Sequence, residues 1–325
     1  MQKEERDGRM QTPEPTISVL LTVHNGMPFV SRTIASILHQ SYADWEFVIV
    51  DDASNDASSD VLHAMAASDP RIWIFKNEAR LGASGGANRG LAECGGRWIA
   101  RIDADDIALP NRLERQLAFV GANPDVKATS CLAYYIDSEG VRRGKTFHDL
   151  TTREAFQNYL KFNRDIGILH PGALIERRTL IAVGGYREEF GPAHDVDLWS
   201  RIADTGALIL VQPECLMEYR VHAASMSARM FQIARLKTQW SRACMIARRS
   251  GKPEPSWEDF EATNKAAPWW RRLNQWRKGN AKRLYRQSGL RFITGHRLLA
   301  LLDIALAGFL QPIYAAGRLR RQLLR

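Results

Sequence analysis

The sequence predicts an α/β protein with a mostly parallel central sheet and a basic, helical C-terminal region. Four buried-strand patterns alternate with helical patterns between residues 16 and 106, as repeated βαβ units do. Three of these strands end in clusters of polar residues. The charge then changes sign along the chain. Residues 226–325 carry 21 Lys+Arg and 5 Asp+Glu, whereas the other residues carry 24 and 31.

The first part of the chain gives the strands of the sheet in order. Near-continuous apolar runs predict buried parallel strands, and they lie at Ile17–Val23, Phe47–Val50, Ile72–Phe75 and Trp98–Ile102. Apolar residues at helical spacing predict helices between them, over Val30–Leu38, around Val61–Met65 and up to Leu91. Right-handed crossovers would join these strands into one sheet.

The middle of the chain is more mixed. Strands are expected at 127–136, 172–175 and 207–211, with a hairpin turn at 137–140. A capping box at 151–154 opens one helix, and a second helix covers 195–203. We therefore expect three parts: a short lead at 1–15, an α/β domain at 16–225 and a helical basic region at 226–325.

The basic region has the composition of a membrane-surface segment. Five of the nine Trp follow residue 225, interleaved with Arg and Lys, as at a membrane interface. The apolar stretch 298–317 is just long enough to span a bilayer, but Asp303, Gln311 and Pro312 weaken that interpretation. A helix lying in the interface is favoured. Packing of this helix on the α/β domain and nucleic-acid binding by the tail are the alternatives.

Polar residues at the strand ends predict the site. In a parallel sheet, ligands bind outside the carboxyl ends of the strands, where His24, Asp51-Asp52 and the Asp103-Ala104-Asp105-Asp106 cluster would meet. Two carboxylates at i and i+2 can share one hard cation such as Mg²⁺ or Mn²⁺. Each cluster could instead be an acidic turn that caps a helix.

Several familiar motifs are missing. No G-x-G-x-x-G follows the first strand and no G-x-x-x-x-G-K-[ST] occurs, which argues against a nicotinamide dinucleotide site and a P-loop. G-x-S-x-G is absent, and the four Cys form no C-x-x-C pair. The glycine-rich stretch Gly82–Gly86 is expected to be a flexible loop. The polar N-terminus does not have the pattern of a signal peptide.

Taken together, these segments resemble the inverting family 2 glycosyltransferases, whose nucleotide-sugar-binding fold is called GT-A. The resemblance covers roughly residues 16–225 and rests on the order and spacing of six segments: 17–25, 48–56, 81–90, 100–106, 183–186 and 194–201. It implies transfer of a sugar from a nucleotide-diphosphate sugar, UDP-linked by family default, to a hydroxyl group of an acceptor. The basic tail suggests a glycan or lipid-linked acceptor in cell-envelope polysaccharide synthesis.

The resemblance also implies a role for each matching position. The catalytic base would be Asp195, with Asp197 as second choice, and the metal ligands would be Asp105 and His222. The nucleotide-sugar site would comprise Thr22, His24, Asp52, Gly82, Asn88 and Asp103. Two positions depart from the family pattern: His24 stands where Tyr is common, and His194 stands where Glu usually precedes the base.

Other functions stay open at this point. A phosphatase-type hydrolase could use Asp103 as nucleophile, although Ile107 stands where that class has Thr or Val. A non-catalytic membrane-associated protein could keep the fold without the activity. The partners expected of the transferase are a nucleotide-sugar donor, the acceptor and an anionic membrane surface, with no nucleic acid. The expected location is the cytoplasmic face of the cell membrane.

Overall fold

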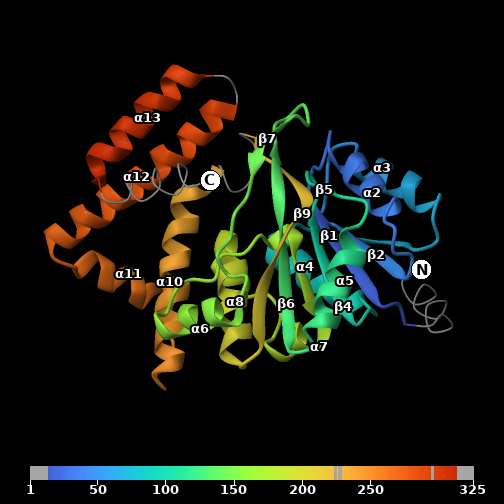
Figure 1. Ribbon diagram of the computed structural model, residues 1–325, viewed down its shortest axis with the longest axis horizontal. Helices are drawn as coiled ribbons and strands as arrows, with labels where there is room; N and C mark the ends of the chain where they lie inside the picture. Colours follow the sequence, from blue (N-terminus) through green and yellow to red (C-terminus); the bar gives the residue numbers. More distant parts are fainter. Residues whose placement is uncertain (1–13, 223–224, 226–228, 294–295, 313–325) are drawn as a thin grey trace. The chain divides into compact units, whose positions relative to one another are not determined.

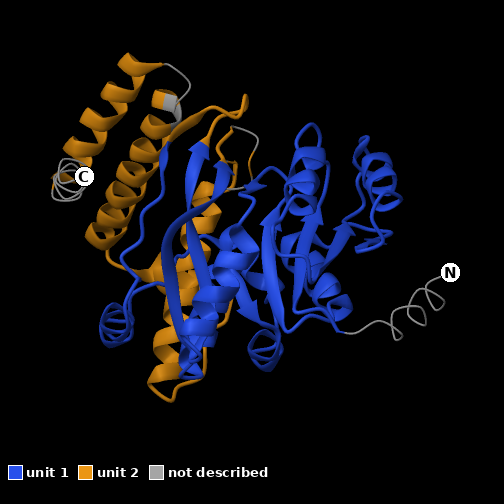
Figure 2. Cartoon of the chain, turned by 45° about the vertical axis from the view of Figure 1, so that its right-hand side comes forward, with its two compact units in different colours: residues 1–135, 144–219 blue, residues 136–143, 220–325 orange. Residues whose placement is uncertain are grey.

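A computed structural model describes residues 14–222, 225, 229–293 and 296–312. The chain divides into two compact units (Figure 2). The first comprises residues 1–135 and 144–219, and the second comprises residues 136–143 and 220–325. The three-part division expected from the charge distribution stays a prediction, since contacts rather than charge define these units.

The first unit carries the sheet and its covering helices (Figure 1), except that the strand residues 136, 142–143 and 220 belong to the second unit. In chain order its elements are β1 (Ile17–Val23), α2 (Val30–Leu38), β2 (Trp45–Asp51), α3 (Ser58–Ala66), β3 (Ile72–Lys76), α4 (Gly82–Glu93), β4 (Trp98–Asp103), β5 (Ile107–Ala108), α5 (Arg112–Ala122), β6 (Val126–Ile136), β7 (Arg142–Lys145), α6 (Arg153–Lys161), η1 (His170–Gly172), β8 (Leu174–Glu176), α7 (Arg177–Ala182), η2 (Glu188–Ala193), α8 (His194–Asp204) and β9 (Leu208–Arg220).

The sheet has a parallel half and an antiparallel half. Its strand order is β3-β2-β1-β4-β8-β6-β9-β5, with β7 paired to β6. The β3-β2-β1-β4 pairs are parallel, whereas β8 pairs antiparallel with β4 and β6, and β5 with β9. The four strands predicted from the apolar runs form the parallel half, so the α/β fold class is confirmed.

The apolar runs are buried because helices cover the sheet. Every residue of β2 is buried, and β1 is buried except at Thr22. Helix α2 turns Val30, Ile34 and Ile37 toward this core, the residues whose spacing predicted the helix. The core is continuous from Ile17 of β1 to Met217 of β9.

The prediction of a flexible loop at Gly82–Gly86 is wrong, because helix α4 begins at Gly82. Asp52 stabilises this helix start: its carboxylate accepts hydrogen bonds from the backbone N–H groups of Leu81 and Gly82, both at 2.8 Å. The glycines let the helix lie close to the sheet. A Cβ at Gly86 would come within 2.4 Å of Thr22 Cγ2. Helix propensity alone argued against this helix, and close packing explains it.

We expect Gly90→Ala to lower the free energy of unfolding by about 1–3 kcal/mol, as overpacking does. The new Cβ would lie 2.3 Å from Leu20 Cδ1 and 3.0 Å from Val50 Cγ2. The matched control is Gly121→Ala in α5, where nothing lies within 4 Å. Urea unfolding of the two variants measures the difference. Equal stability of both would show that α4 does not need this close contact with the sheet.

The middle of the chain follows the prediction with two changes. The strand expected at 207–211 continues to Arg220 as β9, and the strand expected at 172–175 is shorter, because η1 occupies its start. Thr152 is the N-cap of α6, with its side chain accepting from Ala155 N at 3.1 Å. The hairpin turn at 137–140 joins β6 to β7, and Gly140 takes a positive φ of 87° there.

The second unit is mostly helical, with α10 (Phe231–Arg249), α11 (Trp257–Ala266), α12 (Trp269–Ile293) and α13 (Arg297–Leu310). The predicted apolar helix at 298–317 corresponds to α13, and its last residues, 313–317, lie outside the described residues. None of the helices in the described ranges combines the length and apolar character needed to cross a bilayer.

Candidate functional site

The parallel strands bring the predicted donor residues to one edge of the sheet. In the β1–β2 and β1–β4 registers, Thr22 lies beside Val50 on one side and beside Asp103 on the other. Asp52 directly follows β2. Three segments far apart in the sequence therefore meet at the carboxyl ends of adjacent strands, as the topology predicted.

Asp52 is buried and holds the neighbouring loop. Its Oδ1 accepts hydrogen bonds from Asn77 Nδ2 at 2.9 Å and Leu81 N at 2.8 Å, while Oδ2 accepts from Gly82 N. This carboxylate thus fixes the start of α4 beside the sheet edge. A role in contacting a base stays a prediction, and Asp52 would contribute to it from a rigid position.

His24 lies in a loop that interlocks with the loop after β2. Its Nδ1 lies 2.9 Å from Asp52 O, and Asn25 Oδ1 accepts a hydrogen bond from Asn55 N at 2.9 Å. Asn25 and Ala53 both have positive φ, at 55° and 57°. A positive φ at a non-glycine residue such as Ala53 costs energy that the surrounding structure must maintain, and such positions cluster at binding sites.

Asn88 of α4 fixes a segment 98 residues further along the chain. Its Nδ2 donates to Tyr186 O at 2.7 Å, and its Oδ1 accepts from Tyr186 N at 2.8 Å. A Cβ at Gly185, where φ is 66°, would lie 2.6 Å from Asn88 Oδ1. Asn88 therefore positions Tyr186, whereas the sequence had suggested only that it shapes the loop beside the donor.

The Asp103–Asp106 turn places two carboxylates close together. Thr33 Oγ1 lies within hydrogen-bonding distance of Ala104 O and Asp106 O, at 2.9 and 2.8 Å, which holds the turn against α2. Burial raises the pKa of Asp103 to about 6, and the negative charges of Asp105 and Asp195 contribute to this rise. The carboxylates of β4 and α8 are thus near enough to affect one another.

Asp195 lies in the first turn of α8, where the helix dipole favours a negative charge. Its Oδ1 accepts a hydrogen bond from Val196 N at 2.8 Å. Burial raises the pKa of Asp195 above the ordinary value of 3.8, and the neighbouring His194 opposes that rise. Arg187 and Arg201 form their ion pairs with Asp197, two residues further along the helix.

Aromatic and imidazole rings pack beside these carboxylates. His170 lies 5.5 Å from Tyr186 and 5.3 Å from His194, measured between ring centroids. Its Nε2 is 3.0 Å from Tyr186 Oη. Burial lowers the pKa of His170 well below its usual value and raises that of Tyr186 to about 12, so the imidazole is neutral and the phenol stays protonated at pH 7.

Arg101 is a site residue that the sequence analysis missed. It is 3% exposed, and within the described ranges its Nε and Nη1 atoms have no hydrogen-bond partner. Its guanidinium lies 5.9 Å from the Tyr186 ring centroid and lowers the pKa of Asp103. The available signal was a cation within the otherwise apolar strand at 98–102.

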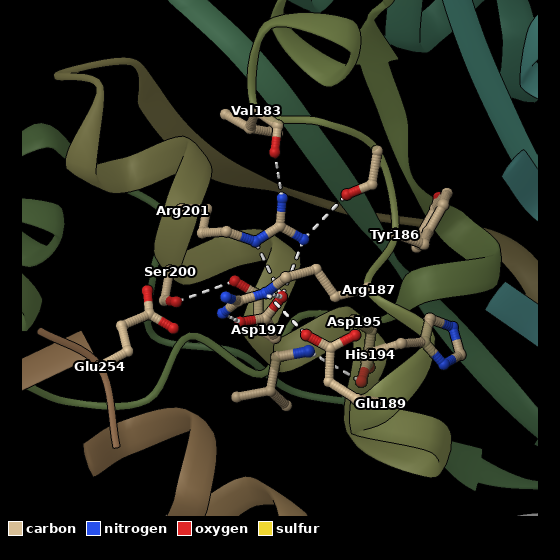
Figure 3. A network of polar contacts seen from close by, with 12 residues as sticks. Val183, Tyr186, Arg187, Glu189, His194, Asp195, Asp197, Ser200, Arg201 and Glu254 are labelled. Carbon is tan, nitrogen blue, oxygen red and sulfur yellow. Dashed lines mark hydrogen bonds and ion pairs between the residues drawn. The ribbon is translucent and has the colours of Figure 1, made fainter. Parts of the chain in front are cut away.

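Asp197, the second choice for the base, has a structural position (Figure 3). Its side chain is fully buried, and Arg187 and Arg201 both point toward it. Arg201 Nε donates to Asp197 Oδ2 at 2.8 Å, while Arg201 Nη2 donates to Gly185 O at 2.8 Å. The carboxylate thus anchors α8 to the segment that carries Tyr186, which argues against Asp197 as the base.

We expect Asp197→Ala to lower the free energy of unfolding by about 3–5 kcal/mol, because it leaves two arginines around a buried gap without their counter-charge. Chemical denaturation measures this change. Asp204→Ala, at the exposed last residue of the same helix, serves as the control and should change stability little. A loss below about 1 kcal/mol at Asp197, the range of surface pairs, would contradict the structural role.

The residues at the end of β4 fit a divalent cation. Asp103 and Asp105 offer hard oxygen ligands. Burial, with a smaller contribution from the negative charges of Asp105 and Asp195, raises the pKa of Asp103, and a bound cation would favour the charged form of that carboxyl. No three His, Cys, Asp or Glu among the described residues are grouped closely enough to form a complete protein site, so phosphate oxygens and water would have to supply the other ligands. His222 follows β9 in the second unit, and its role as a ligand stays a prediction.

Comparison with known proteins supplies the family. The model described as Glycosyl transferase family 2 matches residues 18–184. An uncharacterized glycosyltransferase of Methanocaldococcus jannaschii is 27% identical over 235 residues, covering 70% of this chain and 80% of its own. UDP-Glc:alpha-D-GlcNAc-diphosphoundecaprenol beta-1,3-glucosyltransferase WfgD of Escherichia coli is 28% identical over 226 residues, covering 69% and 83%.

A solved structure shows the same fold. Mannosyltransferase PcManGT from Pyrobaculum calidifontis, in complex with GDP-Man and Mn²⁺, is similar with a TM-score of 0.55 and 18% identity, covering 99% of this chain and 86% of its own. Since the family model also matches just over half of the 325 residues, from the first strand to the segment before Tyr186, the chain belongs to glycosyl transferase family 2 and is a glycosyltransferase with the GT-A fold.

Proposed function

We propose that this glycosyltransferase moves a sugar from a nucleotide-diphosphate sugar to an acceptor hydroxyl by a metal-assisted single displacement that inverts the anomeric carbon. One observation carries the proposal. The end of β4, which carries Asp103 and Asp105, and the start of α8, which carries Asp195, lie beside the same ring: Arg101 of β4 is 5.9 Å and His194 of α8 is 5.5 Å from the Tyr186 ring centroid. A base and a cation site at one place are what this reaction requires.

Asp195 is the proposed base. It accepts the proton of the acceptor hydroxyl while that oxygen attacks the anomeric carbon and the bond to the diphosphate breaks. A base works best when its pKa approaches the working pH, and burial moves the pKa of Asp195 in that direction. Arg201 pairs with Asp197 and also holds the segment that carries Tyr186. These contacts fix the start of α8, which favours a fixed position for the base.

The strand ends form the proposed donor site. Asp52, Thr22 and His24 lie at the edge that would hold the nucleoside, with Gly82 and Asn88 shaping its border and Asp103 nearest the ribose. Asp105, with His222 as a further candidate, would hold Mg²⁺ or Mn²⁺. When bound, that cation supplies positive charge that offsets the diphosphate leaving group. PcManGT, which shares the fold, is described with GDP-Man and Mn²⁺.

The acceptor proposed here is a lipid-linked glycan. The relative WfgD is named for a diphosphoundecaprenol acceptor and a UDP-glucose donor. The net charge of residues 226–325 is strongly positive, which suits peripheral attachment to an anionic membrane where such acceptors reside. Polysaccharide assembly at the cytoplasmic face follows as the proposed setting.

A panel of nucleotide sugars tests the function. We expect one or a few UDP- or GDP-sugars to raise the melting temperature in the presence of Mn²⁺ and to be turned over with release of the nucleoside diphosphate. Chelation should abolish both effects. Release of inorganic phosphate from a phosphomonoester, without turnover of any nucleotide sugar, would instead support the phosphatase-type hydrolase.

A further inference from the structure

Helices α12 and α13 form a hairpin whose polar contacts lie between the helices. They pack on one another within the second unit. Arg291 Nη1 of α12 lies 2.9 Å from both carboxylate oxygens of Asp303 of α13. Asp303 is therefore buried and ion-paired, although it lies within an apolar stretch of sequence.

The opposite side of α13 exposes large apolar side chains. Leu298 is 79% exposed and Phe309 is 83% exposed. They belong to one stripe at helical spacing, which we name the leucine face: Leu298, Leu301, Leu302, Ala305, Leu306 and Phe309, all exposed. A helix that folds in water normally turns such a stripe toward a core.

A helical hairpin that folds in water buries its large apolar side chains and exposes its charged ones. The α12–α13 hairpin does the reverse. The residues that α13 buries are Ala300, Asp303 and Ala307, and α12 buries Ala281 and Ser288. Small residues and an ion pair between helices, with leucines outside, are typical of helices that pack in an apolar medium. An exposed leucine stripe of this kind marks an interaction surface.

The charge of the neighbouring helix indicates which apolar medium this is. Helix α12 exposes three tryptophans, Trp269, Trp270 and Trp276, of which Trp269 is 73% exposed. It also exposes cations along its length: Arg271, Arg272, Arg277, Lys278, Lys282, Arg283 and Arg286. Tryptophan with Arg and Lys is the composition that suits the headgroup layer of an anionic bilayer.

We infer that the α12–α13 hairpin is the membrane-binding element, with the leucine face of α13 inserted among the acyl chains of an anionic phospholipid leaflet. This inference rests on the peripheral membrane attachment proposed above and adds the helical hairpin that makes it and the face of α13 that enters the lipid. Helix α13 has 14 residues, about 21 Å in length, so it lies along the interface. The Arg291–Asp303 pair stays between the helices, where it needs no contact with lipid.

Vesicle binding by the full chain tests this inference. The wild-type protein should sediment with phosphatidylglycerol vesicles at low salt and less so with phosphatidylcholine vesicles. We expect the double variant Leu301→Glu, Leu302→Glu to weaken partitioning about tenfold or more, because two charges would enter the acyl region. The matched control is Phe147→Glu, Phe162→Glu, which changes two similarly exposed apolar residues of the first unit and should bind as wild type.

Two results would overturn the inference. Equal vesicle binding by the leucine-face variant and its control would show that the leucine face does not enter the membrane. A wild-type chain that ignores anionic vesicles but doubles its mass on concentration, while the leucine-face variant stays monomeric, would show that the face joins two copies. Turnover of a soluble nucleotide sugar by the leucine-face variant separates these outcomes from failure of the proposed function, since that reaction needs no membrane.

Discussion

Replacing Asp195 with Asn is expected to lower kcat for sugar transfer by about 10²–10⁴-fold, the usual contribution of a general base. The KM for the nucleotide sugar should change little, because Asp195 acts on the acceptor hydroxyl. The amide keeps the shape of the side chain and cannot accept the proton. Steady-state kinetics with saturating donor measure the effect.

The pH profile gives a second readout for the same residue. Wild-type kcat/KM should fall as the pH is lowered through the pKa of Asp195, since only the carboxylate form can accept a proton. Burial raises that pKa above 3.8, so the acid limb should lie at higher pH than for an ordinary Asp. Asp60→Asn, an exposed Asp in the first turn of α3, is the control for loss of a helix-start charge. Full activity in the Asp195→Asn protein would remove this residue from the mechanism.

Replacing Asp105 with Ala is expected to abolish the dependence of sugar transfer on Mn²⁺ and to lower the rate by about 10²–10³-fold, the range found when transition-state charge loses one stabilising partner. Asp105 neighbours Asp103 at the end of β4, and its negative charge contributes to the raised pKa of that residue. Removing it should also remove the increase in melting temperature that nucleotide sugar and Mn²⁺ give together.

Asp60→Asn is again the control, and circular dichroism should confirm that the Asp105→Ala protein is folded. Undiminished transfer that still responds to Mn²⁺ would show that the metal is held elsewhere. His222→Ala would then be the next variant, because the family resemblance gave it the same role. An Asp105 variant that is inactive yet still binds the nucleotide sugar only with Mn²⁺ would also contradict the assignment.

The parallel half of the fold was predictable from sequence because burial on both faces leaves a clear pattern. The runs at 17–23, 47–50, 72–75 and 98–102 each became a strand within two residues of the expected bounds. The glycine-rich start of α4 was not predictable in this way. Its helix depends on tertiary contacts, namely the caps from Asp52 and the close approach of Gly86 and Gly90 to β1, and local propensity does not report these.

The candidate site was predictable only in part for a similar reason. Strand ends in a parallel sheet must share an edge, so the meeting of His24, Asp52 and Asp103 was expected from topology. The contributions of Arg101, His170 and Tyr186 depend on how distant segments pack around Asp195. The family resemblance already favoured Asp195 over Asp197 as the base, and the structure adds that Asp197 is buried and paired with Arg187 and Arg201.

The anomeric configuration of the first product tests the central claim most directly. The active donor from the nucleotide-sugar panel would be incubated with its acceptor, and proton NMR would give the configuration of the new glycosidic bond. A single displacement with Asp195 as base predicts inversion relative to the nucleotide sugar. Retention of the donor configuration would contradict the account, because it would require two displacements or a front-side attack that the proposed arrangement of base and donor does not provide.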